Sequence, residues 1–305
     1  GRLGAKITNG QAGKKLLPPE DGEVAEFMQK RFANEGIDVR LQAKVIGARL
    51  RGGNVVLELA DGDSISADAL LIAAGRTPNL NALDLGKAGV AHDEHGVTTN
   101  DYLQTSQPHI YAAGDITNRL KFTHTADATA RVGVRNILMP LPFLRQKMDF
   151  RGVPWCTYTD PEVAHVGLGE KAAKSQNVDY DLFTVPVEEL DRAVLESEEA
   201  GFVKVLTKKG SDEILGVTLV SAHAGDLLHE FVLALKQGIG LGALAATIHA
   251  YQTFDELPRK ARDQHDNTRL NPHPKDLFPR PYDRDPHCRQ TSENPRGPIG
   301  NRSRR

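Results

Sequence analysis

The pattern of apolar and polar positions divides the first part of the chain into a helix and a set of strands. Across residues 20–34 the apolar side chains recur at helical spacing, and Gly36 supplies the left-handed residue that often ends a helix. Alternating segments follow, and Asp61-Gly62 between two of them is typical of a hairpin turn. We therefore expect a helix and then a strand meander, with strands at residues 37–41, 44–50, 55–59 and 64–67.

Two short apolar runs predict buried strands farther along the chain. Residues 70–74 are wholly apolar and end at Gly75, and residues 109–113 end in the same way at Gly114. Such runs are typical of parallel strands that are covered on both faces. Residues 125–138 then have the period of a helix, which the prolines just after it bring to an end.

From about residue 153 the pattern changes to short strands mixed with helices, which predicts an α+β unit with antiparallel strands. The last part, residues 273–305, is rich in proline and arginine and poor in apolar side chains, so we expect a disordered tail there. The expected strands are 155–158, 163–166, 202–206 and 217–220, and the expected helices are 170–175, 226–236 and 241–246.

Length and charge narrow the classes of function. The 305 residues allow two globular domains or one large one, and the net charge of −2 gives no general attraction to nucleic acid or to anionic lipid. No apolar run reaches the ~20 residues that span a bilayer, and no signal peptide is recognisable. Two cysteines are too few for a disulfide scaffold, so we expect a protein of the reducing cytoplasm. From the charge and the short apolar runs we expect no nucleic-acid partner and no membrane.

The strongest chemical signal is Ala112-Ala113-Gly114-Asp115. Small residues at the carboxyl end of a parallel strand let a ligand approach the backbone, and an aspartate there accepts hydrogen bonds from ligand hydroxyls. An ordinary strand followed by a Gly-Asp turn explains the same residues without a ligand. Farther on, Thr123-His124-Thr125-Ala126 opens a helix, whose free N–H groups suit an electron-rich ring that gains negative charge on reduction.

Together with Gly75-Arg76-Thr77-Pro78-Asn79, these segments resemble the C-terminal part of the flavoprotein pyridine nucleotide-disulfide oxidoreductases. The family includes lipoamide dehydrogenase and glutathione reductase, and the mercuric reductase-like members are the most similar. The resemblance implies FAD and NAD(P) as cofactors, with Asp115 on the ribityl chain of FAD and the segment from Lys121 on the flavin ring. The cofactor-binding residues that it implies are Gly75, Arg76, Gly114, Asp115, Lys121, Phe122, Thr123, His124 and Ala126.

The resemblance also implies a fold class and a division of the chain. The fold is expected to combine partial FAD/NAD(P)-binding Rossmann-like α/β domains with an α+β dimerisation domain that has an antiparallel sheet. Thr159-Asp160-Pro161-Glu162 and His223-Ala224-Gly225-Asp226 resemble parts of the dimerisation domain, so a homodimer is expected. The expected parts are a partial NAD(P)-binding domain (1–77), the C-terminal segment of the FAD-binding domain (78–150), the dimerisation domain (151–272) and the tail (273–305).

The nicotinamide side is only partly readable. In the family an acidic residue at a strand end holds the adenosine ribose of NADH, and Gln11 stands at that place here. A neutral residue with Lys14 and Lys15 nearby weakens the case for strict use of NADH and leaves NADPH open. A divergent loop explains the same residues equally well.

Near residue 250 the acid–base motif of the family is altered. Lipoamide dehydrogenase and glutathione reductase carry a His followed by Pro-Thr, and a Glu that orients the imidazole as it passes a proton to the redox thiols. Here Tyr251 and Gln252 stand at the His and Pro positions, and Glu256 is retained. Tyrosine, with a pKa of about 10, is a poor thiol base but can donate a hydrogen bond, and mercuric reductases also have tyrosine here. Tyr251, Glu256 and His249 are the candidate catalytic residues; the alternatives are an interface aromatic for Tyr251 and a packed histidine for His249.

Three motifs of the family do not occur in the sequence: the Gly-x-Gly-x-x-Gly of the FAD pyrophosphate, the Cys-x4-Cys redox pair and the glycine-rich loop for NAD(P). Cys156 is expected to be a buried inert thiol, Cys288 has no partner, and no His/Cys spacing indicates a metal site. Two hypotheses stay open. The chain is a fragment of an FAD-dependent oxidoreductase that passes hydride through flavin to a disulfide or a soft metal ion, or it is a non-catalytic dimerisation or interaction module.

Overall fold

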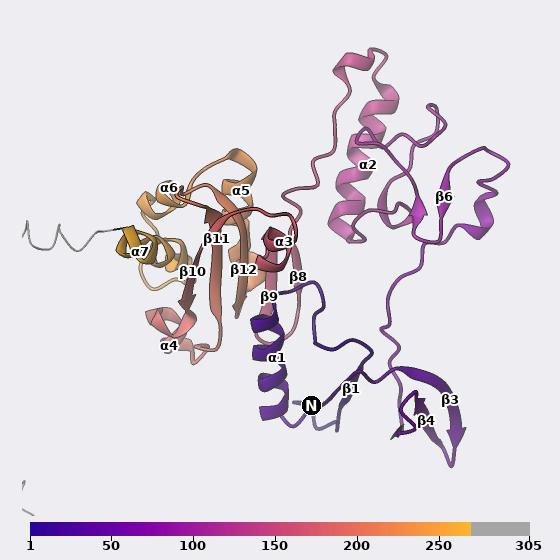
Figure 1. Cartoon of the computed structure of the whole chain (residues 1–305), viewed down its shortest axis with the longest axis horizontal. Helices are drawn as coiled ribbons and strands as arrows, with labels where there is room; N and C mark the ends of the chain where they lie inside the picture. The colour runs from indigo at the N-terminus through magenta and orange to yellow at the C-terminus, as the bar shows by residue number, and fades with distance from the viewer. Residues whose placement is uncertain (270–305) are drawn as a thin grey trace, which may run out of the picture.

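A five-stranded sheet forms the largest element of the fold (Figure 1). The structure is a computed structural model that describes residues 1–269. The strand order is β10-β11-β12-β9-β8, and every neighbouring pair is antiparallel, so the expected α+β unit is confirmed. The strands are β8 (Trp155–Thr157), β9 (Glu162–Gly167), β10 (Tyr180–Pro186), β11 (Phe202–Lys208) and β12 (Ile214–Ser221).

Helices cover one face of this sheet. α5 (Ala224–Gln237) lies on β9 and β12, α7 (Leu257–Arg269) lies on β10 and β11, and α6 (Leu241–Ala246) packs against α7. The core beneath them takes alternate residues from each strand, such as Val203 and Val205 of β11, which are fully buried. Two short helices complete this part of the chain, α3 (Glu170–Ser175) and α4 (Asp191–Glu196).

Helix α1 (Gly22–Asn34), which comes from the N-terminal part of the chain, covers the opposite face of the sheet. Its Val24 and Met28 are fully buried against Phe202 of β11 and Val220 of β12. Because side chains alternate across a strand, the residues that do not enter the main core point toward α1 and the loop before it. The predicted first helix is thus confirmed, and its apolar face is used to join two distant parts of the sequence.

Two small sheets belong to the same N-terminal part. The expected strands between residues 37 and 67 are confirmed, and Gly62, at φ +92°, makes the expected hairpin turn. The parallel pair is β1 (Thr8–Gln11) with β2 (Asp38–Leu41), and the antiparallel meander is β3 (Val45–Arg51), β4 (Asn54–Leu59) and β5 (Ser64–Ala67).

The middle of the chain contains little regular strand. The expected second helix is confirmed as α2 (Thr123–Leu138), which follows the short 3-10 helix Gly114–Ile116. The only regular pairing of this part within the described chain is β6 (His92–Asp93) with β7 (Gly96–Val97). The other 3-10 helices are Asn81–Leu83, Pro142–Leu144, Val187–Glu189 and Phe254–Glu256.

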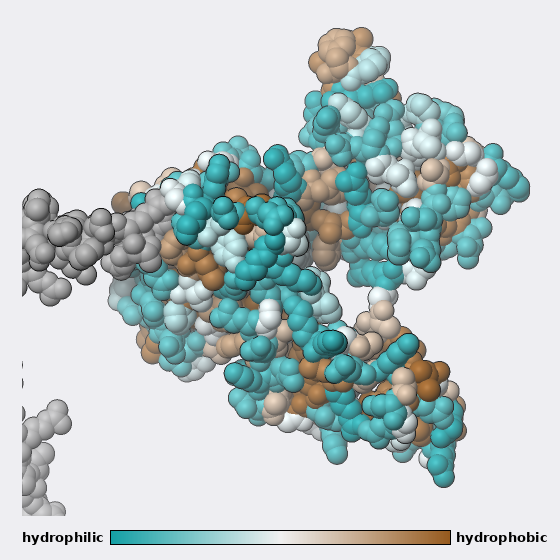
Figure 2. All heavy atoms as spheres, viewed as in Figure 1, coloured by the Kyte–Doolittle hydropathy of each residue, from teal (hydrophilic) through white to brown (hydrophobic). Residues whose placement is uncertain are grey.

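Two expected strands are wrong. Residues 70–74 form no strand, and Leu71 and Ile72 are 89% and 77% exposed. A parallel strand is held by hydrogen bonds to its neighbours, and no strand in residues 1–269 pairs with this run. Residues 109–113 also form no strand, since Tyr111 makes only an isolated bridge to Gln104. Apolar side chains are also visible on the surface around β3 and β4 (Figure 2), where Ile46 and Leu50 are 65% and 79% exposed.

Several regular elements were not expected, among them β10, α4, α7 and the short pair β6–β7. Among residues 257–264 of α7 the buried side chains are Leu257, Pro258 and Ala261, and the charged residues between them give a weak helical pattern. The expected disordered tail, residues 273–305, lies outside the described residues. Among the helices of residues 1–269, none has both the length and the apolar character needed to cross a membrane.

Candidate functional site

Three segments that the sequence predicts to bind a cofactor lie side by side. The Arg76 guanidinium donates to the backbone oxygen of Lys121 at 2.8 Å and lies 3.5 Å from the Asp115 carboxylate. In return, the Lys121 ammonium donates to the backbone oxygen of Arg76 at 3.2 Å. The Asp115 side chain keeps 47% of its surface exposed, so its carboxylate is accessible to a ligand.

Gly114 lets this segment pack closely against α2. Its φ is +74°, and an added Cβ would lie 3.1 Å from the Cβ of Ala126. Its N–H donates to the Thr129 hydroxyl at 3.1 Å, and that hydroxyl donates to the backbone oxygen of Thr125 at 2.7 Å. The small residues of this motif therefore hold Asp115 next to the first turn of α2.

The first turn of α2 carries the remaining residues of the predicted flavin site. No side chain caps this helix, so the N–H groups of Thr123 and His124 have no partner within it. The Thr125 hydroxyl is buried and, among the described residues, has no hydrogen-bond partner. The rings of Phe122 and His124 stack in parallel, with centroids 5.2 Å apart. An accessible carboxylate, unpaired donors and an aromatic surface thus occur together.

Gln11 ends β1, at the carboxyl edge of the parallel pair β1–β2. Its side-chain amide donates to the backbone oxygen of Lys15 at 3.3 Å, which folds the following loop back on the strand end. Open α/β sheets bind ligands at this edge of their strands. The structure thus places Gln11 at the end of the sheet where a nucleotide is expected.

Tyr251 and Glu256 do not contact each other through a hydrogen bond. The Tyr251 hydroxyl donates to Asp191 at 2.9 Å, and Glu256 pairs with Arg259 at 3.4 Å. The hydrogen bond to Asp191 and the charge of that carboxylate raise the pKa of Tyr251 above its usual range. Tyr251 is 70% exposed, so it is a surface hydrogen-bond donor and not a base at neutral pH.

His249 is mostly buried and contacts Glu230. Its Nε2 lies 3.0 Å from Glu230 Oε1, and its side chain is 11% exposed. Its Nδ1 is buried and has no hydrogen-bond partner among the residues that the structure describes. The three candidate catalytic residues therefore fall into separate contacts, with His249 on Glu230 and Tyr251 on Asp191.

Cys156, the expected inert thiol, is the free cysteine among the described residues. Cys156 in β8 is half-buried, and its sulfur lies 3.9 Å from the Glu162 carboxylate. Burial, with the charges of Glu162 and Asp226, raises the pKa of Cys156 to about 12. The thiolate is the reactive form, so this side chain is an inert thiol at neutral pH.

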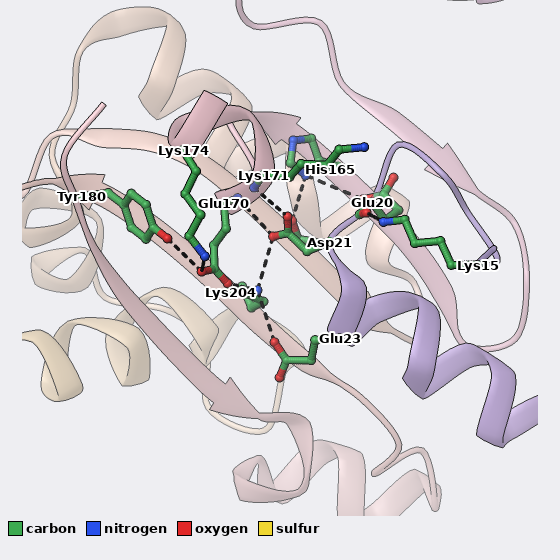
Figure 3. Close-up of polar contacts among 11 residues, drawn as sticks. Lys15, Glu20, Asp21, Glu23, His165, Glu170, Lys171, Lys174, Tyr180 and Lys204 are labelled. Carbon is green, nitrogen blue, oxygen red and sulfur yellow. Dashed lines mark hydrogen bonds and ion pairs between the residues drawn. The ribbon is translucent and has the colours of Figure 1, made fainter. Parts of the chain in front are cut away.

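A row of polar side chains that the sequence did not suggest crosses the sheet on the face toward α1. Figure 3 shows two of them, His165 and Lys204, with the charged residues around them. The strand register sets Trp155 of β8 opposite His165 of β9, and His165 opposite Thr218 of β12. Thr218 in turn lies opposite Lys204 of β11. We call these four side chains the polar row. Three of them, in β9, β12 and β11, each lie two residues along the strand from an apolar residue that contacts α1, so they share that face of the sheet.

Lys204, at one end of the polar row, is 1% exposed and lies in a network of carboxylates. Its Nζ is 2.7 Å from Glu170, 3.2 Å from Glu23 and 3.3 Å from Asp21. Burial by itself would lower the pKa of Lys204, but the hydrogen bond to Glu170 and the charge of Asp21 outweigh it and raise that pKa. The buried ammonium is therefore charged.

Asp21 joins the N-terminal part of the chain to α3. Its carboxylate accepts hydrogen bonds from the backbone N–H groups of Glu170 and Lys171, each at 3.1 Å (Figure 3). Burial raises the pKa of Asp21, but these two N–H groups and Lys204 together lower it below its ordinary value. One carboxylate thus caps a helix far away in the sequence and also pairs with the buried lysine.

Glu20 contacts the other end of the polar row. It accepts a 2.7 Å hydrogen bond from the Trp155 indole and lies 3.9 Å from His165 Nδ1. His165 is held by the Thr218 hydroxyl at 2.8 Å and by the backbone oxygen of Gly167 at 3.0 Å. Burial lowers the pKa of His165, so its ring is neutral at neutral pH.

The stability of the fold is expected to fall at low pH, because Glu170 becomes protonated. Burial raises the pKa of this carboxyl, but hydrogen bonds from Lys204 and Tyr180 outweigh it and lower the pKa from 4.5 to about 2. Such a group stabilises the fold above its unfolded pKa and loses that contribution as the pH falls through its folded pKa. The thermal midpoint should therefore drop between about pH 4.5 and about pH 2, and Glu170→Gln should flatten this part of the profile. Equal slopes in the two proteins would contradict the assignment.

Sequence reasoning missed Lys204, His165 and Asp21, although part of the signal was present. Lys204 and His165 each stand in the middle of a strand whose other inward positions are apolar. A polar residue at such a position marks a buried polar contact. The partner of Lys204 could not be predicted from the sequence. Asp21 lies 183 residues away, and only the packing of α1 on the sheet brings the two together.

Comparisons with known proteins agree with this architecture. The family model described as pyridine nucleotide-disulphide oxidoreductase matches residues 1–130, and the model of the dimerisation domain of that family matches residues 153–262. Dihydrolipoyl dehydrogenase 2 of Arabidopsis thaliana is 33% identical over 270 residues, which are 86% of this chain and 52% of that protein. Leghemoglobin reductase of Glycine max is 31% identical over 267 residues, which are 86% of this chain and 50% of that protein.

Solved structures show the same fold. The HOCl-induced flavoprotein disulfide reductase RclA from Escherichia coli is 25% identical with a TM-score of 0.77, over 85% of this chain and 59% of that one. LpdA from Mycobacterium tuberculosis, at 24% identity, has a TM-score of 0.79 over 86% of this chain and 57% of that one.

The fold is therefore that of the disulfide reductases, with nucleotide-binding α/β parts and an α+β dimerisation domain, as the sequence predicted. The chain belongs to the pyridine nucleotide-disulfide oxidoreductase family. It spans about half the length of the curated relatives that it matches.

Proposed function

We propose that this chain acts in an FAD-dependent oxidoreductase that passes hydride from NAD(P)H through flavin to an acceptor. The observation that supports this most directly is the meeting of Arg76, Asp115 and Lys121 at the start of α2. Arg76 lies 39 residues from Asp115 and 45 from Lys121 in the sequence, and their contact brings two cations and an accessible carboxylate next to the N–H groups of the first turn of α2.

The residues present fit one end of FAD. Asp115 would accept hydrogen bonds from the ribityl hydroxyls, and the unpaired N–H groups of α2 with the orphaned Thr125 hydroxyl would bind the polar edge of the ring. Arg76 and Lys121 place positive charge where a reduced ring carries negative charge. When bound, FAD supplies the transfer of hydride equivalents, and these residues bind and orient it.

The nucleotide partner is proposed to bind at the carboxyl edge of β1 and β2. Gln11 at that edge carries no charge, and Lys14 and Lys15 follow it in the loop. A neutral residue gives no carboxylate to the ribose hydroxyls and does not repel a 2′-phosphate. Use of NADPH as well as NADH is therefore part of the proposal, and the ratio of the two rates of flavin reduction tests it.

The acceptor is proposed to be a disulfide or a soft metal ion, as in mercuric reductase-like enzymes. The RclA reductase, whose structure is similar to this one, has also been solved as a Cu(II) complex. Tyr251, which replaces the usual histidine, is an exposed hydroxyl on Asp191 and suits a donor to the acceptor better than a base. A cytoplasmic homodimer formed through residues 151–272 completes the proposal, with residues 1–77 and 78–150 as the nucleotide and flavin parts.

Tyr251→Phe is expected to slow reduction of the acceptor by about tenfold, the value of one hydrogen bond at the reacting group. Reduction of the flavin by NAD(P)H should stay unchanged, because Tyr251 contacts Asp191 and none of the predicted flavin residues. Stopped-flow traces resolve the two steps. Equal slowing of both steps would remove Tyr251 from the acceptor site.

Reconstitution with FAD tests the proposal itself. The protein is incubated with FAD, passed over a gel-filtration column, and its visible absorption is recorded. A flavin band that elutes with the protein, at the volume of a dimer, is the expected result. A colourless protein would overturn the proposed flavin site.

A second candidate function is a dimerisation or interaction module without redox activity. The cysteines favour it: the sequence holds only Cys156 and Cys288, which do not form a Cys-x4-Cys redox pair, and the pKa of Cys156 is raised to about 12. This candidate predicts a stable, colourless dimer that does not oxidise NAD(P)H.

A further inference from the structure

We infer that Trp155 is a positioning residue for the flavin site, because it fixes the segment from Lys121 to His124 against the five-stranded sheet. The inference rests on the proposed function in that this segment is taken to contact the flavin ring. Its structural part, the attachment of that segment through Trp155, stands on contacts that do not depend on any cofactor.

The segment reaches the Trp155 ring through Phe122. Phe122 lies parallel to the indole, at 8° between the planes and 6.5 Å between the centroids. His124 also stacks on Phe122, and its Nε2 donates to the backbone oxygen of Pro154 at 2.8 Å. Two side chains of the segment thus contact two consecutive residues at the start of β8.

Trp155 is itself held in place by His165 and Glu20. The His165 ring lies 4.4 Å away, and both of its nitrogens are held by hydrogen bonds. The indole N–H donates to Glu20, which is 3% exposed. Stacking leaves a ring free to slide, but a hydrogen bond from its edge fixes its rotation in the plane. The position of the Trp155 ring is therefore set by Glu20 and His165, independently of its contact with Phe122.

This support has a direct consequence for the proposed cofactor site. The residue before Phe122 is Lys121, whose backbone oxygen receives the Arg76 guanidinium that also lies next to Asp115. A displacement of the Phe122 ring therefore moves one of the three groups of that site. Trp155 contacts two parts of the chain that are far apart in the sequence, at Glu20 and at Phe122, so its loss would loosen both attachments.

The experiment compares three variants. Trp155→Leu removes the ring contacts to Phe122 and His165 and the indole donor, whereas Trp155→Phe keeps an aromatic ring next to both side chains. Tyr158→Leu is the matched control, since it also removes an aromatic ring near the end of β8 but from a side chain that is 81% exposed. Hydrogen–deuterium exchange over residues 121–129 is measured without FAD, and the FAD dissociation constant and visible flavin spectrum are measured with it.

Trp155→Leu is expected to raise exchange over residues 121–129 and the FAD dissociation constant by roughly tenfold each, the value of lost aromatic contacts, and to shift the flavin band. Trp155→Phe should recover part of both effects, because it keeps the ring but not the indole donor, and Tyr158→Leu should show neither. Because Trp155 is the only tryptophan in the sequence, its emission should also be quenched when FAD binds to the wild-type protein.

Two results would overturn the inference: unchanged exchange in Trp155→Leu, or altered exchange with unchanged FAD affinity and flavin spectrum. Failure of Trp155→Phe to recover either property would also contradict the role of ring stacking. A wild-type protein that binds no FAD would instead overturn the proposed function. In that case the exchange of residues 121–129 alone decides whether Trp155 holds the segment.

Discussion

Lys204→Met is expected to lower the free energy of unfolding by about 3 kcal/mol, because removing one partner of a buried ion network leaves the others without compensation. The lysine is 1% exposed and its Nζ contacts Asp21, Glu23 and Glu170. The largest loss of charge compensation is at Asp21, because this buried carboxylate keeps only backbone N–H groups as partners. Urea denaturation followed by circular dichroism measures the change.

Lys174→Met is the matched control for this prediction. Lys174 also pairs with Glu170, at 3.1 Å, but its side chain is 67% exposed, so water replaces the lost partner. Its loss should leave the stability nearly unchanged. Adding Glu170→Gln to Lys204→Met should restore part of the lost stability, because one uncompensated charge is removed. Equal effects of the two lysine variants would contradict the account of Lys204 as a buried, charged group.

Asp115→Ala is expected to weaken FAD binding by at least about tenfold, since a charged acceptor of ligand hydrogen bonds is worth more than a neutral one. The carboxylate lies at the meeting point of Arg76 and the first turn of α2, and nearly half of its surface is accessible. Equilibrium titration with FAD, followed by flavin fluorescence, measures the loss.

Asp127→Ala is the control for Asp115→Ala. Asp127 is an exposed carboxylate on the same helix, paired with Arg131 at 2.8 Å and not with any residue of the proposed flavin site. It should bind FAD as the wild-type protein does. If the two variants bind FAD equally well, Asp115 does not contact the cofactor.

The local pattern of the sequence predicted much of the fold because most elements bury one face. The apolar face of α1 and the alternation in β9, β11 and β12 are visible in the sequence, and the helices α3 and α6 begin and end where their patterns do. The same reasoning failed at residues 70–74. A wholly apolar run predicts burial only if neighbouring strands are available, and in residues 1–269 no strand pairs with this run.

Some residues of the candidate site could also be predicted from the local sequence, and others could not. Gly114, Asp115 and the start of α2 were readable because a small-residue turn and a helix N-terminus have local signatures. Their contact with Arg76 was implied by the family resemblance alone. The polar row and the Trp155 contacts had no local signature, since they depend on strand register and on the packing of α1 across the sheet.

Anaerobic addition of NADPH or NADH to the FAD-loaded protein tests the central claim most directly. The account predicts that the visible flavin band bleaches, because hydride moves from the nucleotide bound near Gln11 to the ring held at Asp115 and Lys121. A protein that takes up FAD but keeps its full absorption band with either nucleotide would contradict the proposed oxidoreductase function.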